Sequence, residues 1–287
     1  MIKLEDFLRQ DLRESSVQSY LYSIRQYKKN NRNADKYDYQ KVMQYIEILR
    51  NNYQSTTIKA TLGCIKKYYD YLIETGKRKD NPARAIRIKD GKEKPIQLQD
   101  LFTEKELQQL LEPRKERYPF LEKRNKVIMS LLVNQALRIG EIEKLKLEDI
   151  NLEKATIQIT GTGLTNSREL PLKAGQILLL YEYTSHDRNK LKTFRNDENA
   201  LLLGKLGTPI RTEDIDYLIS TYQKKSKKRL TATTIRQSVI TNLLAKNNDL
   251  RIVQHFAGHK SPDTTEKYRQ TGLNALKTAI DKLHPIR

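Results

Sequence analysis

The chain has 287 residues, 54 of them Lys or Arg and 35 Asp or Glu, so its formal net charge at pH 7 is +19. Such a surplus indicates a polyanionic partner, with nucleic acid as the first candidate, and a hydrophobic content of 37% excludes an intrinsically disordered chain. The single cysteine, Cys64, excludes an internal disulfide and a cysteine-based zinc cluster. No long apolar run, lipidation signal or cleavable leader is found, so we expect a cytoplasmic protein that does not bind membranes.

Amphipathic helices are predicted for the first 75 residues. Their apolar residues recur at helical spacing in three stripes: Val17, Tyr20, Leu21, Ile24 and Tyr27; Val42, Tyr45, Ile46 and Leu49; and Ile58, Leu62, Ile65, Tyr69 and Leu72. Lys59, Lys66 and Lys67 fall outside the third stripe. The apolar faces can build a bundle, and the basic face is expected to stay free.

Breaking residues divide the chain into two predicted domains. Gly76 should end the third helix, and Asn81-Pro82 and a polar stretch follow it. We therefore predict a helical domain over residues 1–83, a linker over 84–101, and a second domain over 102–287.

The second domain is predicted to be helical with one β-hairpin. Thr103 and Glu106 have the spacing of a helix capping box. Residues 155–160 alternate strictly, a turn with Thr162 at its centre follows, and 168–172 can return as the second strand. Helices are expected from residue 124, from 139, and near 174–184, 212–225, 232–246, 249–256, 261–270 and 273–283.

Three motifs stand in the second domain, in this order: Ala136-Leu137-Arg138-Ile139-Gly140-Glu141, Thr233-Thr234-Ile235-Arg236, and Ala257-Gly258-His259 followed by Thr264-Thr265-Glu266-Lys267-Tyr268. Their order and spacing resemble the tyrosine recombinase (phage integrase) family, in the simple two-domain form of Xer-like recombinases and of resolvases encoded by transposons or plasmids. The resemblance implies a mainly α fold. It pairs a SAM-like helical core-binding bundle with a mixed α/β catalytic domain that has a small β-hairpin or sheet.

The resemblance also implies a role for each matching residue. Tyr268 is the implied nucleophile, Arg138 and Arg236 clamp the scissile phosphate, and His259 orients the phosphate or exchanges a proton. Glu141 matches the acidic residue that supports the first arginine. The residues suit this chemistry, because a guanidinium is always protonated and can bind two phosphate oxygens at once. Since the arginines supply the positive charge and the phosphotyrosine bond conserves the energy for rejoining, we expect no metal and no nucleotide cofactor.

Two positions depart from the family pattern. Thr233 stands three residues before Arg236, where the family commonly has a His. Thr162 stands on the hairpin turn, where the family has a Lys that acts as general acid to the leaving 5′ oxygen. The hydroxyl groups of both threonines are candidate phosphate contacts, and Lys154 and Lys173 are candidate replacements for the missing Lys.

The implied function is site-specific recombination through a 3′-phosphotyrosine intermediate and a Holliday junction, by a mobile-element resolvase or integrase. The implied partners are double-stranded DNA with inverted-repeat core sites, a homo-tetramer on two DNA sites, and accessory proteins, which are left open. Two alternatives remain: a non-catalytic DNA-binding protein on the same fold, and a type IB topoisomerase. The last predicted helix has an apolar stripe that can dock in cis or on a neighbouring protomer: Leu273, Leu276, Ala279, Ile280 and Leu283.

Overall fold

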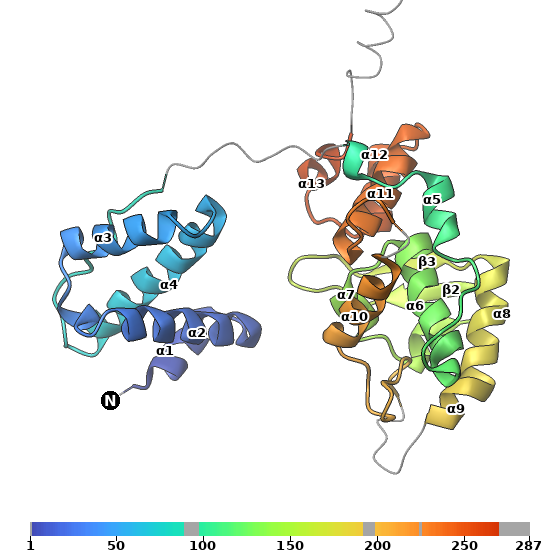
Figure 1. The fold of residues 1–287 in the computed structure, drawn as a ribbon, viewed down its shortest axis with the longest axis horizontal. Helices are drawn as coiled ribbons and strands as arrows, with labels where there is room; N and C mark the ends of the chain where they lie inside the picture. The colour runs from blue at the N-terminus through green and yellow to red at the C-terminus, as the bar shows by residue number, and fades with distance from the viewer. Residues whose placement is uncertain (1, 89–97, 192–198, 224–225, 270–287) are drawn as a thin grey trace, which may run out of the picture. The chain divides into compact units, whose positions relative to one another are not determined.

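The computed structural model describes residues 2–88, 98–191, 199–223 and 226–269. The chain separates into two compact units, Met1–Lys94 and Pro95–Arg287, each with its own core (Figure 1). Within the described ranges, no helix is long and apolar enough to cross a membrane.

The first unit is a bundle of four α-helices and one short 3-10 helix: α1 (Leu4–Asp11), α2 (Glu14–Asn30), η1 (Ala34–Lys36), α3 (Tyr39–Arg50) and α4 (Ser55–Glu74). The three predicted apolar stripes lie on α2, α3 and α4 and supply most of the core, with only Tyr20 and Leu49 partly exposed. Gly76 follows α4 in the left-handed conformation (φ 69°), and its N–H bonds to Ile73 O (2.9 Å). The predicted helix end is therefore confirmed.

The basic face of α4 is not entirely free, contrary to the expectation. Lys66 Nζ donates to the carbonyl oxygen of Ile86 (2.9 Å), and Lys67 pairs with Asp11 on α1 (2.5 Å). Ile86 and Ile88 fall in the stretch assigned to the linker, yet their side chains are buried with the first core. Their apolar contacts and the bond from Lys66 hold this stretch against α4.

The second unit is mainly α-helical. Its helices are η2 (Leu98–Asp100), α5 (Glu104–Gln109), η3 (Pro119–Leu121), α6 (Glu122–Gln135), α7 (Ile139–Ile142), η4 (Leu147–Asp149), α8 (Ala174–Glu182), the π-helical turn η5 (Tyr183–Asp187), α9 (Arg188–Leu191), α10 (Thr212–Tyr222), α11 (Ala232–Ala245), α12 (Leu250–Ala257) and α13 (Pro262–Glu266). The capping box of Thr103 and Glu106 is confirmed at the start of α5. The helix predicted over 273–283 lies outside the described residues.

A three-stranded antiparallel sheet accompanies these helices, in the order β1 (Ile150–Asn151), β2 (Thr156–Ile159) and β3 (Arg168–Pro171). The predicted hairpin is confirmed as β2 and β3, which pair from Thr156 with Pro171 to Ile159 with Arg168. Strand β1 was not predicted, because two residues are too few to display an alternating pattern.

Helix α6 lies at the centre of the second unit and packs against α8 and α11 (Figure 1). Ten of its 14 residues are buried, which explains why its apolar pattern is continuous rather than one-sided. The helix ends at Ala136, whose backbone is left-handed (φ 51°). The chain therefore turns sharply there, two residues before Arg138.

Candidate active site

Arg138 stands at the N-terminal end of the short helix α7, just after the turn that closes α6. Its backbone N–H donates to the carboxylate of Glu141, one turn later, at 2.9 Å. This bond caps the helix and fixes the backbone from which the Arg138 side chain extends. The Nε atom of Arg138 is buried and has no hydrogen-bond partner in the described structure. A buried guanidinium nitrogen without an acceptor is costly, so this group is suited to a ligand oxygen.

Arg236 lies on α11 and is 5% exposed. Its two terminal nitrogens donate to backbone oxygens, Nη1 to Ala136 (2.6 Å) and Nη2 to Ala257 (2.5 Å). The side chain thereby joins the turn before Arg138 to the end of α12. Burial, followed by the charge of Arg138, lowers the pKa of Arg236 to about 10, so the group remains protonated at neutral pH.

His259 follows α12, after Gly258 has closed the helix in the left-handed conformation (φ 66°). The ring is 2% exposed, and Nδ1 shares a 2.9 Å hydrogen bond with the hydroxyl of Thr265, which is itself fully buried. Burial and the neighbouring charges of Arg236 and Arg138 lower the pKa of His259 to about 4. The imidazole is therefore neutral at pH 7. Its Nε2 is buried without a partner among the described residues.

Tyr268 follows α13 and is partly buried against the small apolar cluster of Ile240, Val253 and Ala257. Its backbone N–H donates to Thr265 O (3.0 Å). The phenol ring stacks on the imidazole of His259, with centroids 5.8 Å apart and planes 14° from parallel. The structure therefore brings Arg138, Arg236, His259 and Tyr268 together, although they span 130 residues of sequence.

Glu141 is buried in an ion pair that the sequence did not predict. Arg168, the first residue of β3, binds both of its carboxylate oxygens, Nη1 to Oε1 at 2.9 Å and Nη2 to Oε2 at 3.0 Å. Burial alone would raise the pKa of Glu141, but the hydrogen bonds and charge of Arg168 hold it below its usual value. One signal could have revealed Arg168: alternation along β3 places it on the same inward face as Leu170.

The hairpin turn is held beside His259. The hydroxyl groups of Thr162 and Thr165 are hydrogen-bonded (3.0 Å), and Thr165 forms a β-bridge with His259. Asn166 N–H donates to the carbonyl oxygen of Gly258 (2.9 Å). Thr162 therefore belongs to a turn that contacts the His259 segment, and it also lines a hollow of about 620 Å³ next to Glu141.

The other predicted candidates are Thr233, Lys154 and Lys173. Thr233 is exposed on the first turn of α11, three residues before Arg236. Lys154 precedes β2 and Lys173 follows β3, so both stand at the end of the hairpin opposite Thr162. At about 3.3 Å per residue, the four-residue strands separate the two ends by roughly 13 Å. Neither lysine occupies the place of the missing general acid.

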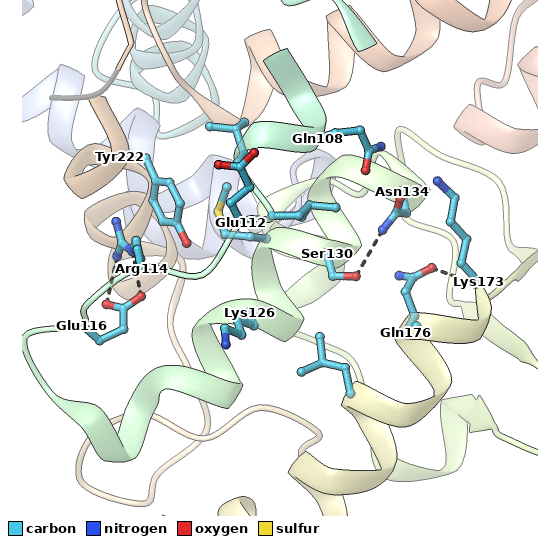
Figure 2. Close-up of a pocket in the computed structure, with 15 residues that line it drawn as sticks. Gln108, Glu112, Arg114, Glu116, Lys126, Ser130, Asn134, Lys173, Gln176 and Tyr222 are labelled. Carbon is cyan, nitrogen blue, oxygen red and sulfur yellow. Dashed lines mark hydrogen bonds and ion pairs between the residues drawn. The ribbon is translucent and has the colours of Figure 1, made fainter. Parts of the chain in front are cut away.

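A separate pocket of about 300 Å³ lies between α5, α6 and α8 (Figure 2). Of the predicted candidates, Lys173 alone lines this pocket. Several polar side chains of the pocket interact with one another. Arg114 pairs with Glu116 (2.8 Å) and lies over the ring of Tyr222 (3.6 Å from the guanidinium carbon to the centroid). The pocket is therefore distinct from the cluster around His259.

Comparison with known proteins identifies the family. Residues 100–273 match the model of the phage integrase family. The chain belongs to that family. Tyrosine recombinase XerC of Chlamydia pneumoniae is 30% identical over 85% of this chain and 77% of its own length. Tyrosine recombinase XerD of Oceanobacillus iheyensis is 27% identical over 98% of both chains.

Solved structures agree on the fold. XerH site-specific recombinase bound to palindromic difH substrate matches with a TM-score of 0.71 and 21% identity, over 92% of this chain and 79% of that one. The Tn1549 transposon integrase in complex with a circular intermediate DNA matches with a TM-score of 0.70 and 15% identity, over 99% of this chain and 100% of that one. The predicted fold class is confirmed, and the chain is a tyrosine recombinase of the Xer-like type.

Proposed function

We propose that this tyrosine recombinase cleaves and rejoins duplex DNA at specific sites, with Tyr268 as its nucleophile. The observation that carries the proposal is the cluster itself. Arg138, Arg236 and His259 lie close to Tyr268. Arg138 Nε and His259 Nε2 are buried and have no hydrogen-bond partner among the described residues. Such groups suit the oxygens of a phosphodiester, which become more negative in the transition state.

The proposed reaction exchanges one phosphoester bond for another. The phenol of Tyr268 loses its proton to water, its oxygen attacks phosphorus, the bond from phosphorus to the 5′ oxygen breaks, and the 3′ phosphate remains on the tyrosine. Arg138 and Arg236 neutralise the non-bridging oxygens, while Nε2 of neutral His259 can donate a hydrogen bond to one of them or accept a proton. The released 5′ oxygen takes up one proton. Rejoining is the reverse reaction, so no nucleotide is consumed.

The threonines have secondary roles in this proposal. Thr233, one turn before Arg236, offers a hydroxyl to a phosphate oxygen in place of an imidazole. Thr162 offers the corresponding group on the hairpin turn. Because a hydroxyl is a far weaker acid than an ammonium group, proton delivery to the 5′ oxygen should be slow or should involve water.

We further propose an assembly like that implied by the family: four protomers on two inverted-repeat core sites, strand exchange through a Holliday junction, and a role in a mobile element. The formal charge of +19 supports a DNA partner. The solved structure described as a transposon integrase with a circular intermediate DNA supports the role in a mobile element. The one described as a recombinase bound to a palindromic substrate supports inverted-repeat sites.

A nicked duplex tests the proposal, because the broken strand lets a short fragment diffuse away and traps the covalent adduct. The wild-type protein should form an adduct that survives denaturation, and Tyr268→Phe should bind the same duplex without forming one. An adduct of normal yield with Tyr268→Phe would assign the nucleophile to another residue.

Thr162 stands where the family has a lysine. This difference favours one competing function, a DNA-binding protein without catalysis on the same fold. Wild-type protein that binds the duplex but forms no adduct would support it. A type IB topoisomerase would instead relax supercoiled plasmid without joining two sites. Relaxation and two-site recombination, measured on the same plasmid, separate these outcomes.

A further inference from the structure

The ion pair of Glu141 and Arg168 lies beneath the candidate active site and is closed to solvent. The two side chains are 1% and 0% exposed, and two parallel hydrogen bonds of 2.9 Å and 3.0 Å join them. A planar guanidinium facing a planar carboxylate is the most directional ion pair in proteins. It fixes both the distance and the relative orientation of the two segments that carry the partners.

Each partner also holds the backbone of a segment that carries a candidate catalytic residue. Glu141 Oε2 accepts the backbone N–H of Arg138 (2.9 Å). Arg168 Nε donates to the carbonyl oxygen of Phe256 (2.9 Å), three residues before His259. A continuous chain of hydrogen bonds thus joins the Arg138 turn to the His259 turn through one guanidinium group.

Gly258 lets the backbone before His259 approach the guanidinium group of Arg168. Its backbone lies so near Arg168 that a Cβ at this position would be 2.6 Å from Nη1 and 3.0 Å from Cζ. The hairpin also reaches this turn, since Asn166 N–H donates to Gly258 O. The guanidinium therefore lies directly under the residue that precedes His259.

The pair also decides how much positive charge faces the ligand. Three guanidinium groups and one carboxylate meet here: Arg138, Arg168 and Arg236 with Glu141. Arg168 binds both oxygens of Glu141, so most of that carboxylate charge is compensated by Arg168, and only a lesser part acts on Arg236. Without Arg168, the carboxylate would turn to Arg138 and weaken its attraction for phosphate.

We propose that Arg168 is a positioning residue for DNA cleavage, which holds Arg138 and His259 in register through Glu141, Phe256 and Gly258. The inference rests on the proposed cleavage reaction. Arg168 touches neither phosphate nor tyrosine in this scheme. Its effect should appear in the rate of the chemical step, because a misplacement of about 1 Å can cost roughly 100-fold in rate.

The test compares Arg168→Lys with Arg188→Lys. A lysine retains the charge but has a single ammonium group, so it cannot bond to Phe256 O and to both Glu141 oxygens together. Arg188 is a matched control in the same unit: it is 2% exposed and donates to the backbone oxygen of Ala200 (2.6 Å). The probe is a nicked duplex that the wild-type protein selects by binding from a random-sequence pool. The bond that the wild-type protein cleaves is then mapped on the covalent adduct.

Arg168→Lys should bind this duplex with an unchanged Kd, but its single-turnover rate of adduct formation at saturating DNA should fall about 100-fold. Arg188→Lys should lower Tm at least as much and keep the wild-type rate. A second duplex carries a methylphosphonate at the cleaved bond, which removes the negative charge of one non-bridging oxygen. The loss from Arg168→Lys should shrink there, because a neutral oxygen depends less on a well-placed Arg138.

Two results would overturn the inference: equal rates for the two lysine variants, or the same loss from Arg168→Lys on both duplexes, which a merely structural role predicts. Failure of the proposed function looks different. In that case the wild-type protein itself would bind the enriched duplex but form no adduct, and the proposed role of Arg168 would be excluded as well.

Discussion

The imidazole of His259 lies nearly parallel to the phenol ring of Tyr268, with 5.8 Å between centroids and 14° between planes. Nδ1 of His259 is hydrogen-bonded to the hydroxyl of Thr265. The other ring nitrogen, Nε2, is buried and has no hydrogen-bond partner among the described residues, the hydroxyl of Tyr268 included. We infer that His259 acts on the phosphate rather than as the base for Tyr268.

Replacement of His259 by glutamine should therefore reduce cleavage without reducing binding. The amide can still donate a hydrogen bond but cannot exchange a proton, so we expect the rate of adduct formation to fall about 10²-fold to 10⁴-fold. Gel-shift and single-turnover assays on one nicked duplex measure the two effects. An unchanged cleavage rate would remove His259 from the reaction.

The low pKa of His259 makes the stability of the second unit depend on pH. The pKa is about 4 in the folded protein and about 6.5 in an unfolded chain, so between these values the unfolded state binds more protons. Neutral His259 therefore contributes fully to the free energy of unfolding above about pH 6.5. This contribution, at most about 3 kcal/mol, is lost as the pH falls toward 4. Urea unfolding at a series of pH values should show this loss, and His259→Gln should lack it. The exposed His255 is the control, since His255→Gln should follow the wild-type curve.

Thr265 should matter because it is the partner of His259 Nδ1. Thr265→Val keeps the shape of the side chain but leaves a buried ring nitrogen without a partner, at a cost of about 1–3 kcal/mol. The freed ring should also lower the cleavage rate. Thr264 is exposed on the same helix, so Thr264→Val should change neither Tm nor rate. Similar effects of the two substitutions would show that the hydrogen bond has no special role.

Gly258→Ala should harm the site in two ways. The left-handed backbone (φ 66°) disfavours a side chain, and the new methyl group would press on Arg168 at 2.6 Å. We expect the free energy of unfolding to fall by at least about 1 kcal/mol from the backbone strain alone. The rate of cleavage should fall as well. Gly175, on α8, has open space around its Cα. Gly175→Ala should instead stabilise the helix by up to about 1 kcal/mol and leave cleavage intact.

Deletion of residues from Gly272 onward tests the proposed assembly. The sequence predicts an apolar stripe from Leu273 to Leu283, and exposing such a stripe to water would be unfavourable. If it docks on a neighbour, the truncated protein should fold and bind one site, yet fail to join two sites in native gels. If it docks in cis, Tm should fall by the loss of roughly 1.5 to 3 kcal/mol for each large side chain uncovered. A stable truncated protein that still recombines would exclude both roles.

The sequence alone determined the features that repeat or follow a fixed spacing. The apolar stripes located α2, α3 and α4, the capping box located the start of α5, and strict alternation located β2 and β3. The motifs around Arg138, Arg236, His259 and Tyr268 identified the family. These signals are local or ordered along the chain, so they need no knowledge of contacts.

Tertiary structure decided what depends on distant partners. Nothing adjacent to Glu141 in sequence indicates that its carboxylate binds Arg168, 27 residues later, or that Gly258 closes over that guanidinium. The neutral state of His259 could not be predicted from the sequence, because desolvation and the field of three arginines act only once the chain has folded around the ring.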